Sequence, residues 1–217
     1  MKSSHLLLSY AVTPIHVGSG RSPGIVDLPF QRDSLGYPVV YGSSFKGVLK
    51  SRFLLDKNDK NKAECAFGSD VDSEENYMGT LIVSDLIPVL YPVSSLTEGY
   101  VYITDEYLVK RIEDLTSFVN DNPPYKKNDQ KGTVKVGIED RQFEYLLSPN
   151  EDVQSLGSLI QNKSVYVFSQ KDGSALIESS LIRVQRNVLN RNSKKSENLW
   201  SEEYLPAGTV LIGTIVN

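Results

Sequence analysis

The residue best suited to chemistry is Asp27, a carboxylate that follows a glycine-rich stretch. Residues 17–24 contain three glycines and one proline, so the backbone there can come close to another molecule. A carboxylate beside such a loop can hold a hydrated Mg²⁺ or Mn²⁺ ion. One carboxylate is a sparse metal site, and capping the loop is the commoner role for an aspartate in this setting. Asp27 is therefore a candidate for catalysis and metal binding, with a structural alternative.

Three other polar side chains are weaker catalytic candidates. The imidazole of His16 titrates near neutral pH and could act as an acid or base, although a lone histidine after a strand is more often structural. Glu202 and Tyr204 stand shortly before a turn proline. They could position a substrate, or they could equally be surface residues.

The segment from Gly42 could bind a phosphate group. Gly42, Ser43 and Ser44 precede apolar residues at helical spacing, so they are expected to cap a helix N-terminus. Such an end presents unpaired N–H groups and a positive dipole, and Lys46 and Lys50 would lie one and two turns further on. The alternative is an ordinary cap with solvated lysines.

Charge is segregated along the chain, although the formal net charge is only -4. Residues 41–62 contain six basic and two acidic side chains, and residues 183–195 contain five basic and no acidic ones. Residues 63–121 between them contain twelve acidic and two basic side chains. If the two basic segments share a face, they form a cationic surface for a polyanion. Ordinary solvated surface is the alternative for each of them.

Composition excludes several classes of protein. A chain of 217 residues with 40% hydrophobic residues can form one domain without disulfides. Cys65 is the only cysteine and there are two histidines, which argues against a disulfide framework and against a multi-cysteine or histidine-rich zinc site. No apolar run reaches the roughly 18 residues that span a bilayer. A cytoplasmic protein without a membrane partner is therefore expected.

The hydrophobic pattern predicts a mixed fold. Helices are expected from about residue 42 and over residues 105–119, and residues 175–179 fit either a short helix or one arm of a hairpin. Strands are expected at residues 6–12, 81–93, 100–103, 134–138, 165–168 and 208–216. The elements lack a regular βαβ order and a GxGxxG motif, so an α+β sandwich with helices on one face of the sheet is favoured.

Five stretches, in this order along the chain, resemble the RAMP superfamily of CRISPR proteins. They are similar in particular to the repeated backbone subunit of the type III-B effector of antiviral defence, the Cmr complex. The resemblance covers nearly the whole chain and rests on Thr13–Gly20, Val26–Arg32, Tyr37–Gly47, Val83–Asp85 with Tyr91–Leu96, and Glu202–Thr209.

The resemblance implies a fold and its boundaries. It implies a single modified RRM-like (ferredoxin-like) domain over residues 1–217, with insertions at about 56–80 and 120–150. It also implies a β-hairpin thumb at about 183–198, which coincides with the second basic segment. Within this family, residues 175–179 resemble a short helix.

The resemblance also implies a function. Copies of the subunit stack head to tail along a CRISPR RNA (crRNA), together with the other Cmr subunits, and expose its guide region to target RNA. Each thumb wedges between base pairs at regular intervals. An aspartate in the glycine-rich loop, which is Asp27 in this chain, then serves cleavage of the target with a divalent metal, Mg²⁺ or Mn²⁺.

RNA contacts are expected from the glycine-rich loop, the start of the first helix and the thumb. The residues concerned are Gly18, Gly20, Arg21, Ser43, Ser44, Lys46, Lys50, Arg183, Arg186 and Arg191. Their affinity would be salt-dependent and independent of sequence, because pairing between guide and target supplies the specificity. Val188 and Leu189 are apolar in a polar segment. They could wedge against a base, or they could equally be the packing pair of a hairpin.

Two alternatives and one departure from the family remain. The chain could be a structural RNA-binding scaffold without cleavage activity, or a soluble protein unrelated to RNA whose basic segments lie on opposite faces. Members of the family usually continue beyond the segment that matches the end of this chain, so part of the family fold is expected to be missing. The last strand, ending at Val216, is then expected to be an exposed edge that favours assembly.

Overall fold

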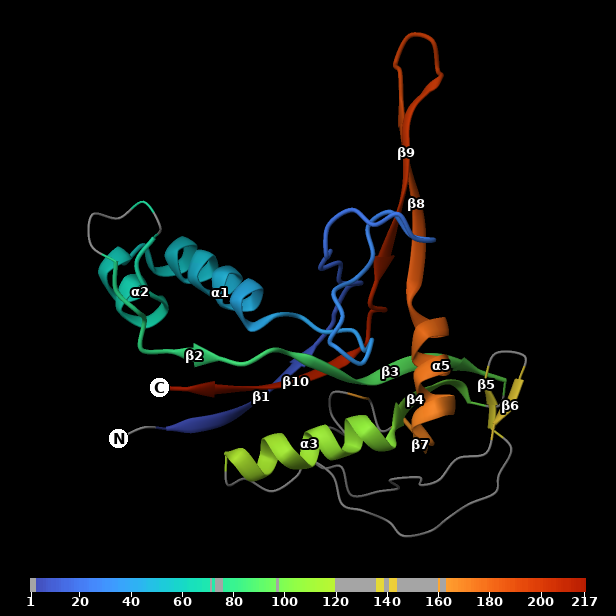
Figure 1. The fold of residues 1–217 in the computed structure, drawn as a ribbon, viewed down its shortest axis with the longest axis horizontal. Helices are drawn as coiled ribbons and strands as arrows, with labels where there is room; N and C mark the ends of the chain where they lie inside the picture. Colours follow the sequence, from blue (N-terminus) through green and yellow to red (C-terminus); the bar gives the residue numbers. More distant parts are fainter. Residues whose placement is uncertain are drawn as a thin grey trace.

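The centre of the fold is one open sheet whose strands follow the order β1-β10-β3-β4-β7 (Figure 1). The structure is a computed structural model that describes residues 3–70, 72, 76–96, 98–119, 136–138, 141–143, 160 and 163–217. The strands of this order are β1 (Ser4–Tyr10), β3 (Ile87–Ser95), β4 (Gly99–Asp105), β7 (Val165–Phe168) and β10 (Val210–Val216). Neighbouring strands are antiparallel except β4 and β7, which run parallel.

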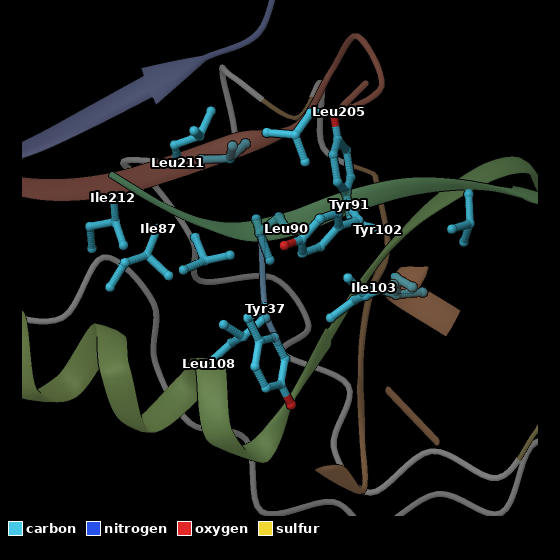
Figure 2. Packing of buried hydrophobic residues seen from close by; sticks show 14 of the residues in the cluster. Tyr37, Ile87, Leu90, Tyr91, Tyr102, Ile103, Leu108, Leu205, Leu211 and Ile212 are labelled. Atoms are coloured by element: carbon cyan, nitrogen blue, oxygen red, sulfur yellow. The ribbon is translucent and has the colours of Figure 1, made fainter. Parts of the chain in front are cut away.

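Helix α3 (Glu106–Phe118) covers one face of the sheet. It begins where predicted, because the Asp105 side chain accepts a hydrogen bond from the Leu108 N–H group at 2.9 Å. Leu108 and Ile112 lie one turn apart and are almost fully buried. Figure 2 shows Leu108 on the side of the sheet toward which Ile87 and Ile212 point. Burying each such side chain contributes about 1.5–3 kcal/mol.

Helices α1 (Gly42–Lys57) and α2 (Lys60–Phe67) lie on the other side of the sheet from α3 (Figure 1). The expected α+β fold with an open sheet and helices is confirmed, with α3 on one side of the sheet and α1 on the other (Figure 1). Helix α2 falls within the segment 56–80 that was expected to be an insertion. Helix α5 (Gln170–Ser180) packs against β3, β4 and β7, so the ambiguous residues 175–179 form a helix.

A two-stranded hairpin projects from the sheet and is here called the thumb (Figure 1). It consists of β8 (Ile182–Leu189) and β9 (Ser196–Tyr204), with Ile182 opposite Tyr204 at its root. The sequence placed the thumb at residues 183–198, and the hairpin extends to residue 204 on its second strand. Just beyond β9, Leu205 pairs with Ile15, so the thumb continues directly into the body of the protein.

Two expected strands differ from the structure. The apolar run 81–93 is divided into β2 (Ile82–Val83) and β3, because Ser84 and Asp85 interrupt the strand. The expectation of an unpaired last strand is wrong. Strand β10 lies between β1 on one side and β3 with β2 on the other, so its backbone groups are paired within the chain.

The second expected insertion, at 120–150, lies largely outside the described residues. Within it the structure describes β5 (Val136–Ile138) and β6 (Arg141–Phe143), which pair with each other, and β5 also joins β3 at Ser95. None of the helices in the described ranges is long and apolar enough to cross a membrane.

Candidate active site

Asp27 lies against the thumb, held by Ser201 of β9. The Ser201 N–H group and hydroxyl both donate to Oδ2 of Asp27 at 2.8 Å, and the Asp27 N–H group donates to the Ser201 hydroxyl at 2.9 Å. The Leu28 N–H group then donates to the Ser201 carbonyl at 3.0 Å. The glycine-rich loop is thus attached to a strand 174 residues further along the chain.

The Asp27 carboxylate is exposed and ionised at neutral pH. Hydrogen bonds from the hydroxyl and N–H group of Ser201 hold the pKa of Asp27 below its ordinary value of 3.8, and the nearby Arg21 lowers it further. Oδ2 accepts both bonds from Ser201, whereas Oδ1 accepts no hydrogen bond from the described residues.

The protein residues alone make an incomplete metal site. A carboxylate oxygen suits Mg²⁺ or Mn²⁺, which prefer oxygen ligands. Among the described residues, however, no three His, Cys, Asp or Glu side chains gather in a way that could hold an ion. Asp27 Oδ1 fits such an ion only where phosphate oxygens of an RNA supply further ligands.

His16 is fixed by its neighbours. Its Nδ1 atom lies 2.7 Å from the Glu203 carbonyl oxygen, to which it donates as the N–H tautomer. The imidazole ring also packs against the phenol ring of Tyr204, with 5.1 Å between the ring centres. These contacts give His16 a structural role and leave Nε2 as the nitrogen that could exchange a proton.

Glu202 and Tyr204 belong to one hydrogen-bonded cluster on the thumb. The carboxylate of Glu202 accepts bonds from the Tyr204 hydroxyl, from Nε1 of Trp200 at 2.7 Å and from Nε of Arg186 at 3.2 Å. Arg186 also donates to the Tyr204 hydroxyl at 3.0 Å. The Tyr204 and Trp200 bonds are the main reason that the pKa of Glu202 falls from 4.5 to about 2.

Strand β9 separates the expected catalytic residues into two groups. Neighbouring residues of a strand point to opposite faces, so Glu202 and Tyr204 share one face and Ser201 the other. His16 packs on Tyr204, on the first face. Asp27 is bonded to Ser201. All four thus lie at the root of the thumb, but the side-chain hydrogen bonds of Asp27 among the described residues go to Ser201 and to none of the other three.

An ion-pair network that the sequence did not suggest lies beneath Asp27. Glu203 is 2% exposed and accepts hydrogen bonds from Arg32 at 2.8 Å, from Arg183 at 3.3 Å and from the Phe30 N–H group at 3.2 Å. Both arginines also bind Glu178 of α5, at 2.7 and 2.6 Å. The network joins the loop, the thumb and α5. The only sequence signal was a charged residue next to Glu202.

The start of α1 differs from the expected serine cap. Tyr41 is the N-cap residue and makes no side-chain capping bond, while Gly42, Ser43 and Ser44 are the first helical residues. The Gly42 N–H group donates to the Asp85 carboxylate at 2.7 Å, so a carboxylate from the chain itself already occupies part of the anion site. The N–H groups of Ser43 and Ser44 have no partner among the described residues.

The lysines of α1 are engaged within the chain. Nζ of Lys46 donates to the Leu81 carbonyl at 2.7 Å. Nζ of Lys50 donates to the Gly68 carbonyl at 2.7 Å and to the Asp70 carboxylate at 2.6 Å. Each ammonium group retains further donors, but neither is a free surface charge.

The thumb becomes more open toward its tip. Arg183 and Arg186 near the root are in ion pairs with Glu203 and Glu202. Arg191 at the tip is exposed and makes no recorded side-chain bond in the part of the chain that the structure describes. Val188 and Leu189 are 43% and 53% exposed, so the interpretation that they only pack within the hairpin is not supported.

The two basic segments lie on the same side of the sheet. Helices α1 and α2 and the thumb all rise from the side opposite α3 (Figure 1). Helix α3, on the other side, carries Glu106, Glu113 and Asp114 together with Lys110 and Arg111. The two basic segments therefore share one side of the sheet, as a binding surface for a polyanion requires, although acidic residues such as Asp70 and Asp85 lie beside α1 on that side as well.

Comparisons with known proteins agree with this architecture. A model of the RAMP superfamily matches residues 10–216. The CRISPR system CMR subunit Cmr4 of Saccharolobus solfataricus is 33% identical over 95% of this chain and 82% of its own. The CRISPR system Cmr endoribonuclease Cmr4 of Pyrococcus furiosus is 27% identical over 98% of this chain and 81% of its own.

Among solved structures, a chain of the type III-B Cmr-beta complex bound to cognate target RNA is similar to this protein. The TM-score is 0.78 at 28% identity, and the match covers 100% of this chain and 84% of the other.

Proposed function

Because the chain belongs to the RAMP superfamily, we propose that it is the crRNA-binding backbone subunit of a type III-B CRISPR (Cmr) complex and cleaves complementary target RNA through Asp27. It assembles with crRNA, target RNA, further copies of itself stacked head to tail and the other Cmr subunits. A cytoplasmic location and a role in antiviral defence are part of this proposal.

One observation supports the assignment most strongly. The identity of 33% to a Cmr subunit extends over 95% of the chain, and so includes the glycine-rich loop, the start of α1 and the thumb together. The location of both basic segments on the thumb side (Figure 1) supports RNA binding independently, because it follows from the positions of this chain's own residues.

The chemistry at Asp27 is cleavage of a phosphodiester bond. The 2′-oxygen of a target nucleotide attacks the adjacent phosphorus, the bond to the 5′-oxygen breaks, and a 2′,3′-cyclic phosphate and a 5′-hydroxyl result. Oδ1 of the ionised Asp27 carboxylate accepts the proton of the attacking hydroxyl, and water protonates the leaving oxygen. Mg²⁺ or Mn²⁺, when bound, supplies charge relief at the phosphate.

The remaining residues bind and orient RNA. The exposed loop residues Gly18, Gly20 and Arg21 approach the backbone near Asp27. The N–H groups of Ser43 and Ser44 are available to a phosphate at the start of α1. Arg191 and the apolar Leu189 at the thumb tip meet the paired strands. His16, Glu202 and Tyr204 shape the opposite face of the thumb root.

The test is cleavage by the assembled complex with crRNA and complementary target RNA. Asp27→Ala is expected to lower the cleavage rate at least about 100-fold while target binding is retained, because it removes the proton acceptor. Asp114→Ala is the matched control, because Asp114 is an exposed aspartate on α3, on the far side of the sheet. If Asp27→Ala cuts at the wild-type rate, the subunit is a structural scaffold and the catalytic proposal fails.

A further inference from the structure

Three hydrogen bonds join Ser201 to Asp27. The Ser201 N–H group and hydroxyl donate to Oδ2, and its hydroxyl oxygen accepts from the Asp27 N–H group. The Ser201 Oγ atom donates one hydrogen bond and accepts another, and both are to Asp27. Capping a loop needs only one of these bonds.

The three bonds determine which carboxylate oxygen is available. Both donors converge on Oδ2, which restricts rotation of the carboxylate and leaves Oδ1 without a hydrogen bond from the described residues. The backbone holds the same arrangement in place, because the Leu28 N–H group donates to the Ser201 carbonyl at 3.0 Å and the Glu203 N–H group donates to the Leu28 carbonyl at 3.1 Å. Asp27 is therefore oriented by β9 of the thumb.

We propose that Ser201 is a positioning residue that orients the Asp27 carboxylate for target cleavage, with Oδ1 as the reacting oxygen. This inference rests on the proposed function, because it assigns a role to Ser201 only through Asp27. It concerns the rate of the chemical step and not the binding of RNA. The proposal concerns the hydroxyl of Ser201, since every residue except proline would keep the backbone N–H group at this position.

The chain offers a matched pair of substitutions at this site. Ser201→Thr keeps the hydroxyl, whereas Ser201→Val has nearly the shape of threonine without it. Both side chains are β-branched and suit a strand such as β9. Ser201→Ala is a third variant that removes the hydroxyl without adding volume.

The measurement is the cleavage rate at saturating target in the assembled complex, together with the target concentration that gives half that rate. Ser201→Val and Ser201→Ala are expected to lower the saturated rate about 10- to 100-fold, because a misoriented group loses much of its effect. The half-saturating concentration should change less than about twofold. Ser201→Thr should cut at close to the wild-type rate.

The rates of the variants test the role of the Ser201 hydroxyl separately from the catalytic role of Asp27. Equal rates for the threonine and valine variants, whether high or low, would overturn the role of the hydroxyl, as would a loss confined to target binding. If Asp27→Ala abolishes cleavage and Ser201→Val does not slow it, this inference alone fails. If Asp27→Ala itself cuts normally, the proposed function fails and the positioning role fails with it.

Discussion

Replacing Glu203 by glutamine should destabilise the protein more than any other single charge removal at the thumb root. The substitution preserves the size of a side chain that is 2% exposed, but it removes the charge shared by Arg32 and Arg183. Removing one partner of a fully buried ion pair costs about 3–5 kcal/mol. The two arginines are 27% and 48% exposed, so water offsets part of this cost.

We therefore expect a loss of about 2 kcal/mol from the free energy of unfolding. For a chain of this length that corresponds to a fall in Tm of about 4–8 °C. Thermal unfolding of the purified subunit, followed by circular dichroism, measures it. The control is Glu178→Gln, which removes a 46% exposed carboxylate from the same two arginines and should cost about 0–1 kcal/mol. A Tm for the Glu203 variant at or above that of the Glu178 variant would refute the reasoning.

Three further predictions concern the thumb and α1. The Glu202 carboxylate has a pKa lowered from 4.5 to about 2, so its stabilising effect is present above about pH 4.5 and is lost as the pH falls toward 2. Glu202→Gln should lower Tm at pH 7 but no longer do so near pH 2. A difference in Tm between variant and wild type that stays the same at both pH values would contradict this. Arg191→Ala should reduce the slope of log affinity for RNA against log salt concentration by about 0.7–0.9. Arg186→Ala should reduce this slope less, because Arg186 is already paired with Glu202. Equal slopes for the two variants would count against RNA binding by Arg191 at the thumb tip. Gly42→Ala would place Cβ 2.5 Å from the Val83 carbonyl oxygen and should lower the free energy of unfolding by about 1–3 kcal/mol. In Gly47→Ala, on the same helix, the new Cβ meets no atom within 4 Å, so the free energy of unfolding should rise by up to about 1 kcal/mol. Denaturant unfolding measures both changes.

The sequence was sufficient for the elements whose signal is local. The apolar spacing of Leu108 and Ile112, with the capping carboxylate of Asp105 before them, predicts α3 because each contact lies within one or two turns. The strand at 165–168 and the final strand were found for the same reason. Charge counts along the chain located the basic segment 183–195, while its identification as a thumb came from the family resemblance.

The sequence failed where distant residues decide the structure. The start of α1 was misread because the Asp85 carboxylate, 43 residues further on, takes the place of a serine cap. The fixed orientation of Asp27 was not foreseen, since Ser201 is 174 residues away and has no motif of its own. The Glu203 network likewise joins residues from three distant segments. Pattern alone carries no information on such contacts.

The strand β9 also acts as a spacer of fixed length. Ser201, which holds Asp27, and Ser196, near the tip, are five residues apart on the same strand, a distance of about 17 Å in an extended chain. A tip that separates base pairs and a carboxylate that cuts would therefore keep one separation in every copy of the subunit. Inserting two residues into each strand of the thumb, between Ser201 and the tip, would preserve the alternation of faces. It would lengthen the distance from Ser201 to the tip by about 7 Å. The cut would then lie further from the separated pair, while the spacing between copies stayed the same.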